Sequence, residues 1–213
     1  MHMQDHRNHL LTHRARLHRE ADAAFAQWAA GYGVIQHSPQ TQLRIFELAQ
    51  LLVAQGRAAS PADVYRLLRA ADRVASAAMW LTVHMTYAQR VRWDGAALQP
   101  GEYKQTPEGH TGGSLNMVPA YAGYLAANSL TGHTRGWIMG QGHSVAGVEA
   151  VNLLVGNMLP IQAQRYDLSD AGLTRFVGDF YSYSIGPDGR PESPLGSHVN
   201  ANTAGGISEG GYL

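Results

Sequence analysis

The chain has 213 residues, of which 45% are apolar and 15% charged, which is enough apolar material for one sizeable domain, or for one domain with a helical extension. Its 16 basic and 16 acidic side chains give a formal net charge of +0, which argues against the basic surface of a nucleic-acid-binding protein. The absence of cysteine excludes disulfides, thiolate metal sites and a cysteine nucleophile. No apolar run reaches the roughly 18 residues of a membrane span, and the polar N-terminus lacks the apolar core of a signal peptide, so we expect a cytoplasmic protein without membrane contact.

The first third of the chain is predicted to be helical. A stretch rich in alanine and arginine begins near residue 9 and ends at the glycines of GYG. Serine–proline pairs at Ser38 and Ser60 begin two more helices, because a capping residue followed by proline is typical of a helix start. The last of these helices becomes apolar in its second half, so Met85 and Tyr87 are expected in the core.

The pattern changes near residue 93, after which an α/β region is predicted. A loop rich in glycine and proline leads to a helix over 114–130. The apolar run GWIMG (136–140) fits a buried parallel strand, QGHS fits a tight turn, and SVAGVEAVNLLVG (144–156) fits a helix. A further helix is expected over 168–181, capped by Ser169. Because a strand, a glycine-rich turn and a helix begin an α/β unit, the sequence predicts a parallel sheet.

Three loops combine a histidine with glycine and small polar residues. They are EGHTGGS at His110, GQGHS at His143 and LGSHVNANTAGGISEGG at His198. Glycine lets a backbone approach a ligand closely, backbone N–H groups at a helix start bind anions, and histidine moves protons near neutral pH. If the loops converge, they would suit a phosphorylated ligand and proton-transfer chemistry.

Other interpretations of the histidines remain open. Each could be structural or incidental. A metal site built from histidines alone is disfavoured, because no acid lies at metal-ligand spacing from His110, His143 or His198. A serine hydrolase is weaker still, because the chain has no GxSxG turn.

The three loops resemble, in the same order, motifs in the N-terminal region of the phosphoketolases, which are thiamine-diphosphate enzymes related to transketolase. The matching motifs are EGHTGGSLN, GQGHSVAGVEAVN and GSHVNANTAGGISEGGYL. The last is the most specific, because it agrees with the family without a gap at Ser197, His198, Val199, Thr203, Gly205, Ile207, Glu209, Gly210, Gly211 and Leu213. The resemblance covers the chain from about residue 107 onward.

The resemblance implies a fold of class α/β. Residues 1–92 would form a helical N-terminal region, and residues 93–213 would begin a transketolase-like, thiamine-diphosphate-binding parallel-sheet domain that is incomplete at its C-terminus. The chain would then be a piece of the enzyme, from a truncated or split gene, with little activity alone.

The resemblance also implies a lyase that cleaves a ketose phosphate with inorganic phosphate, releasing acetyl phosphate and a shorter aldose phosphate. His110, His143 and His198 would be catalytic and would assist proton transfer. His143, Gly210 and Gly211 would bind thiamine diphosphate, the two glycines through their backbone. The ligands of the Mg²⁺ that bridges the cofactor diphosphate are expected outside this chain. The partners implied are the rest of the enzyme or a second subunit, in a homodimer of the complete protein.

The chain departs from the family pattern at two informative positions. Family members have tryptophan where this chain has Thr111 and histidine where it has Ser208. Transketolase-like ketol transfer is one alternative. The other is a non-catalytic remnant that binds a phosphate ligand or a subunit.

Overall fold

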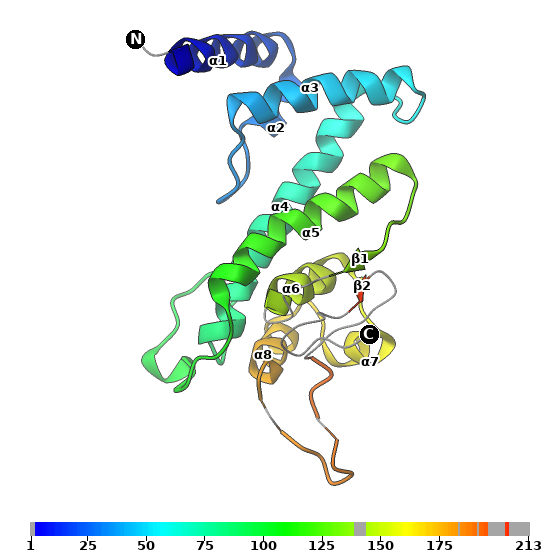
Figure 1. Cartoon of the computed structure of the whole chain (residues 1–213). Helices are drawn as coiled ribbons and strands as arrows, with labels where there is room; N and C mark the ends of the chain where they lie inside the picture. The colour runs from blue at the N-terminus through cyan, green and yellow to red at the C-terminus, as the bar shows by residue number, and fades with distance from the viewer. Residues whose placement is uncertain (1–2, 139–143, 183, 191, 196–202, 205–213) are drawn as a thin grey trace. The chain divides into compact units, whose positions relative to one another are not determined.

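The computed structural model describes residues 3–138, 144–182, 184–190, 192–195 and 203–204, and helices dominate this part of the chain (Figure 1). The chain divides into two compact units. The first contains Met1–Ser76 and Gly123–His133, and the second contains Ala77–Ala122 and Thr134–Leu213. The divisions fall inside the two longest helices, α4 (Pro61–Tyr87) and α5 (Thr111–Thr131).

The first unit is built from α1 (Met3–Ala21), α2 (Ala23–Ala29), α3 (Pro39–Ala54) and the parts of α4 and α5 that belong to it. Capping side chains start two of the helices. Asp22 accepts hydrogen bonds from the first turn of α2, and Ser38 does the same for α3, which has Pro39 at its first position. The core buries an aromatic and aliphatic cluster, namely Phe25, Trp28, Ala29, Ala49, Leu52, Val64 and Tyr65.

The second unit contains the end of α4, the start of α5, and three further helices: α6 (Val145–Val155), α7 (Pro160–Arg165) and α8 (Asp170–Asp179). A short 3₁₀ helix, η1 (Pro100–Glu102), lies in the connection between α4 and α5. The core side chains of this unit are mostly aliphatic and include Leu81, Met85, Val91, Val118, Tyr121, Val148, Val151, Leu173, Phe176 and Val177. Met85 is therefore in the core as expected, whereas Tyr87 is 44% exposed and its predicted burial is wrong.

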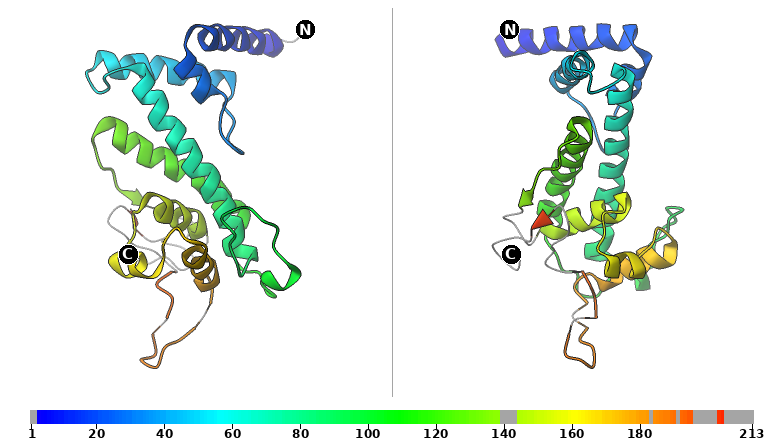
Figure 2. Two further views of the ribbon diagram at one scale, coloured as in Figure 1. Left: turned by 180° about the vertical axis from the view of Figure 1, so that it is seen from behind. Right: turned by 90° about the vertical axis from the view of Figure 1, so that its right-hand side faces the viewer.

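The predicted α/β fold with a transketolase-like parallel sheet is wrong for the residues that the structure describes, because their regular secondary structure is almost entirely helical. Among the described residues, strands pair only between β1 (Trp137–Ile138) and β2 (Thr203–Ala204), where Figure 2 draws them. Two isolated antiparallel bridges, Tyr32–Ile35 and Ala88–Tyr103, add single pairs. Two residues per strand do not form a sheet on which helices could pack. The physical reason is that the other apolar residues repeat at helical spacing, so they bury against helices. Residues 139–140 of the predicted strand lie outside the described residues.

The helices of the second unit begin and end close to the residues expected from their capping signals. Gly156 ends α6 with a φ of 73°, and Ser169 caps α8 by accepting a hydrogen bond from the Gly172 amide. Within the described residues, no helix combines the length and the apolar character that crossing a bilayer would require.

Candidate functional site

Of the predicted site residues, the structure describes only His110. It is exposed and immediately precedes α5. His143, His198, Gly210 and Gly211 lie outside the described residues. Whether the three histidine loops share one pocket can therefore be argued only from the His110 loop and from the residues that flank the other motifs.

The loop that carries His110 is held between the ends of two helices. Gly109 has a φ of +124°, and a Cβ there would lie 3.3 Å from both the Phe180 ring and the Thr86 hydroxyl. Glycine is required at this position by both its conformation and its surroundings. The next turn is fixed by a hydrogen bond of 3.1 Å that the Thr111 hydroxyl donates to the Thr86 hydroxyl. His110 thus leaves the loop at a defined point beside the ends of α4 and α8.

The first turns of α5 and α6 are in close contact. A Cβ on Gly147 would lie 2.4 Å from the Ser114 carbonyl oxygen, so the α6 backbone approaches α5 more closely than any side chain would permit. The Ser114 amide in turn donates a 2.9 Å hydrogen bond to the His110 carbonyl. Ser144, the residue after His143, is buried at the start of α6. The contact therefore brings His110 and the residue that follows His143 into one region of the second unit.

A second interaction holds α5 and α6 together farther along. The buried Tyr121 hydroxyl donates a 2.9 Å hydrogen bond to the Oδ1 atom of Asn152, which is also buried. Such a pair is geometrically specific, because either group would be costly to bury alone. It fixes the rotation of the two helices, and with it the register of the Gly147 contact.

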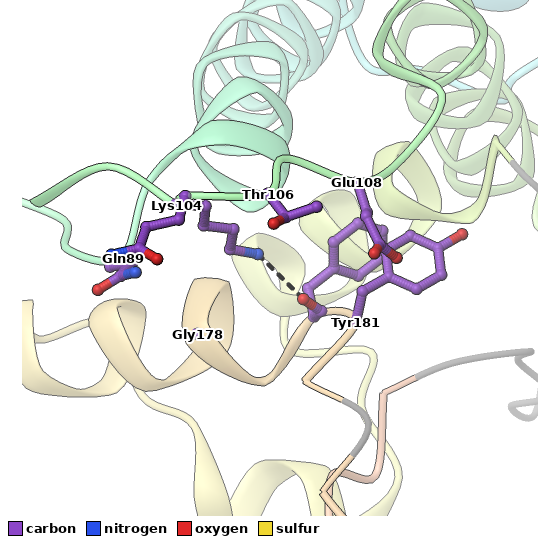
Figure 3. Close-up of a pocket in the computed structure, with 8 residues that line it drawn as sticks. Gln89, Lys104, Thr106, Glu108, Gly178 and Tyr181 are labelled. Atoms are coloured by element: carbon purple, nitrogen blue, oxygen red, sulfur yellow. Dashed lines mark hydrogen bonds between the residues drawn. The ribbon is translucent and has the colours of Figure 1, made fainter.

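Beside the His110 loop, the second unit has an open cavity of about 500 Å³ (Figure 3). The segment before α5 forms one wall, and the end of α8 forms the other. The cavity is lined by Gln89, Lys104, Gln105, Thr106, Glu108, Gly178, Phe180 and Tyr181. It is therefore polar on one side and aromatic on the other, and Gly178 leaves the α8 wall open.

Lys104 is fixed at the edge of this cavity. Its ammonium donates hydrogen bonds to the carbonyl oxygens of Met85, at 2.7 Å, and Phe180, at 3.0 Å. Both carbonyls lie at helix C-terminal ends, where a cation is favoured. Burial lowers the pKa of Lys104 to about 8, although the Glu108 carboxylate acts in the opposite direction. Reasoning from the sequence missed this residue, yet a signal was present: it is the only lysine in the chain.

Two more titratable groups lie in the cavity wall. Burial, together with the Glu108 carboxylate, raises the pKa of Tyr181. Tyr181 also has a φ of 57°, which is rare for a residue other than glycine. Such backbone strain is held by the surrounding structure and is concentrated at functional sites.

The end of α8 that forms this wall is anchored to α7 by Asp179. Asp179 accepts hydrogen bonds from the Arg165 guanidinium and, at 2.8 Å, from the Tyr166 hydroxyl. Burial, and then the hydrogen bond to Asp179, raise the pKa of the Tyr166 hydroxyl above its ordinary value. This cluster ties α7 to α8 and so fixes the backbone that ends in Phe180.

In the part of the chain that the structure describes, no three histidine, aspartate or glutamate side chains are grouped so that they could hold a metal ion. His6, His9 and His13, which are exposed along α1, belong to no such group among the described residues.

Comparison with known proteins does not place this chain in a family: no family model, curated protein or solved structure matches it.

Proposed function

We propose that this chain supplies histidine loops to the thiamine-diphosphate site of a phosphoketolase-like lyase. The reaction cleaves a ketose phosphate with inorganic phosphate and yields acetyl phosphate and a shorter aldose phosphate. The observation that carries the proposal is the contact between the first turns of α5 and α6 at Gly147 and Ser114. It brings together the starts of two helices whose preceding loops carry His110 and His143, which are two of the three histidines in the resemblance.

The described residues fit a bound polar group at one point in this region. The Ser114 hydroxyl is fully buried in the first turn of α5 and has no hydrogen-bond partner among the described residues. A buried hydroxyl without a partner is costly, and a phosphate or hydroxyl oxygen of a ligand would satisfy it. The start of a long helix such as α5 also favours an anion through its N–H groups.

In this proposal His143, Gly210 and Gly211 hold the cofactor, the glycines by close approach of their backbone. When bound, the cofactor would supply a nucleophilic thiazolium carbon and an electron sink for the chemistry at the substrate carbonyl. His110 and His198 accept and return protons at the substrate hydroxyls through their ring nitrogens. The fixed loop around Gly109 orients His110 for this role, since it limits where the ring can point.

The proposal includes the partners that such a reaction needs. These are a ketose phosphate, inorganic phosphate and Mg²⁺ held by ligands outside this chain, with a second subunit completing the site in a homodimer. The cytoplasm is the compartment proposed, because soluble sugar phosphates are its substrate class.

The proposal is tested by titrating the chain with thiamine diphosphate and Mg²⁺ in a calorimeter. We expect saturable binding that is weaker by roughly tenfold in His143→Ala, because one charged or polar contact contributes about 1.4 kcal/mol. The matched control is His13→Ala, which removes an exposed histidine of α1 in the first unit. This variant is expected to bind like the parent chain.

Binding that is equal in the parent and in His143→Ala would remove His143 from the cofactor site. No binding by the parent chain would show that it does not hold the cofactor by itself, and the proposal that its own loops form the site would fail.

A further inference from the structure

The use of basic residues in this chain singles out one side chain. Of 16 basic residues, 15 are arginine and one is lysine, Lys104. Arginine stays protonated in proteins, whereas a lysine can lose its proton and become a nucleophile. The single basic side chain with that capacity lies in the wall of the cavity described above.

Two hydrogen bonds hold the nitrogen of Lys104 in place, and a neutral amine can donate both of them. Nζ donates to two carbonyl oxygens, Met85 O at 2.7 Å and Phe180 O at 3.0 Å. A neutral amine has two N–H groups, so these two carbonyls satisfy both of them and leave the lone pair unused. Figure 3 shows Lys104 reaching from its own segment toward Tyr181, on the side where Glu108 and Thr106 also lie.

The other lining groups indicate what the cavity would accept. The titratable residues that line the cavity are Lys104, Glu108 and Tyr181. Gly178, in the last turn of α8, and Phe180, just after that helix, add no charge to the lining. The carboxylate repels anionic ligands, and the N–H groups of Lys104 already bond to carbonyls. Two amides, Gln89 and Gln105, and the Thr106 hydroxyl supply neutral hydrogen-bonding groups instead. A small, uncharged compound that carries hydroxyl groups fits this lining best.

We propose that this cavity is an imine-forming site, in which Nζ of Lys104 reacts with the carbonyl carbon of a small neutral hydroxyaldehyde or hydroxyketone. The nitrogen–carbon bond forms as the carbonyl π electrons move to oxygen, which takes up a proton from solvent, so that the final product is the protonated imine. Glu108 accepts the proton that the nitrogen releases and returns it to the departing hydroxyl. Water leaves, the nitrogen lone pair closes the C=N bond, and no oxidant or reductant is needed. This activity does not depend on the proposed thiamine-diphosphate site.

The amine must be available as a nucleophile, and the environment of Lys104 favours this. With a pKa near 8, about half of the side chains are neutral at pH 8, compared with about 0.3% for an ordinary lysine. The Glu108 carboxylate raises the pKa of Lys104, but by less than burial lowers it.

The experiment is reductive trapping with glycolaldehyde and cyanoborohydride, followed by peptide mapping. We expect the adduct at Lys104, with a rate that rises as the pH increases toward 8. Lys104→Arg removes the only lysine and should lose the adduct. The matched control is Lys104→Arg combined with Arg44→Lys, which moves the lysine to an exposed position on α3. That lysine should be trapped at least about tenfold more slowly at pH 8.

A second pair of variants tests the cavity while leaving Lys104 in place. A Cβ on Gly178 would meet nothing within 4 Å, so a side chain can begin there without a clash. Gly178→Leu is expected to take up space in the cavity and to reduce trapping by about tenfold or more. Gly123→Leu, at an equally open position of α5, should leave the rate unchanged. Equal trapping of Lys104 and of the relocated lysine, or trapping that Gly178→Leu does not slow, would overturn the proposal.

Discussion

Replacing Gly147 by alanine tests the α5–α6 contact on which the proposed function depends. The new Cβ would lie 2.4 Å from the Ser114 carbonyl oxygen and 3.1 Å from a Val118 methyl, whereas ordinary contacts begin at 3.4 Å. One helix must therefore move by about 1 Å, and the neighbouring atom is backbone, which cannot rotate away. Overpacking of this kind costs about 1–3 kcal/mol.

Alanine also has a better helix propensity than glycine, which offsets the loss by about 1 kcal/mol. The net expectation for Gly147→Ala is a destabilisation of about 0–2 kcal/mol. Gly123→Ala is the matched control, because its Cβ would meet nothing within 4 Å. That variant should be stabilised by about 0.5–1 kcal/mol.

The assay is urea unfolding followed by far-UV circular dichroism, in which the midpoints of the two variants should move in opposite directions. In the cofactor titration, Gly147→Ala should also bind more weakly than the parent. If Gly147→Ala is as stable as Gly123→Ala, the two helix starts are not in close contact, and the reasoning that joins His110 to His143 fails.

Three further outcomes are expected. Because Lys104 has a pKa near 8 in the folded chain and near 10.5 when unfolded, unfolding takes up a proton between these values. Stability measured by urea titration should therefore rise with pH across that window, and Lys104→Met should lack this increment. Asp22→Ala removes two hydrogen bonds to the start of α2 and should cost about 1 kcal/mol in the same assay, with Asp22→Asn close to the parent. The Gln99 amide and then the Arg92 guanidinium lower the pKa of Glu102, so its contribution to stability should be present at neutral pH and lost on acidification. Glu102→Gln should flatten that acid dependence, and an unchanged profile would contradict the assignment.

The sequence predicted the helix boundaries best where the signal is local. Ser38, Ser169 and Gly156 act through hydrogen bonds or dihedral angles within one turn of their own helix, so the residue types alone indicated them. Asp22 was missed because the alanine- and arginine-rich pattern continues across it. The structure instead ends α1 before Asp22 and starts α2 after it.

The prediction of a sheet was wrong because a short apolar segment between two glycines is compatible with a β-strand and equally with another kind of buried segment. Only a partner strand could decide between them, and the described partner is two residues long and separated by more than sixty positions. Tyr87 was predicted to be in the core because the end of its helix is apolar. Which side of a helix end is buried depends on tertiary contacts, and Tyr87 lies on an exposed side.

The importance of Lys104 could not be predicted from neighbouring residues. Its two carbonyl partners lie 19 and 76 positions away, and only the fold brings them together. The composition nevertheless distinguishes Lys104, because the chain has fifteen arginines and this single lysine.

The central claim is that loops carrying His110, His143 and His198 meet at one cofactor site. The most direct test is nitrogen-15 NMR of the histidine rings during addition of thiamine diphosphate and Mg²⁺, with resonances assigned by single His→Ala variants. We expect the signals of these three histidines to shift together at one saturation point, while that of His13 stays in place. Shifts confined to other histidines, or no shift at all three, would contradict the account.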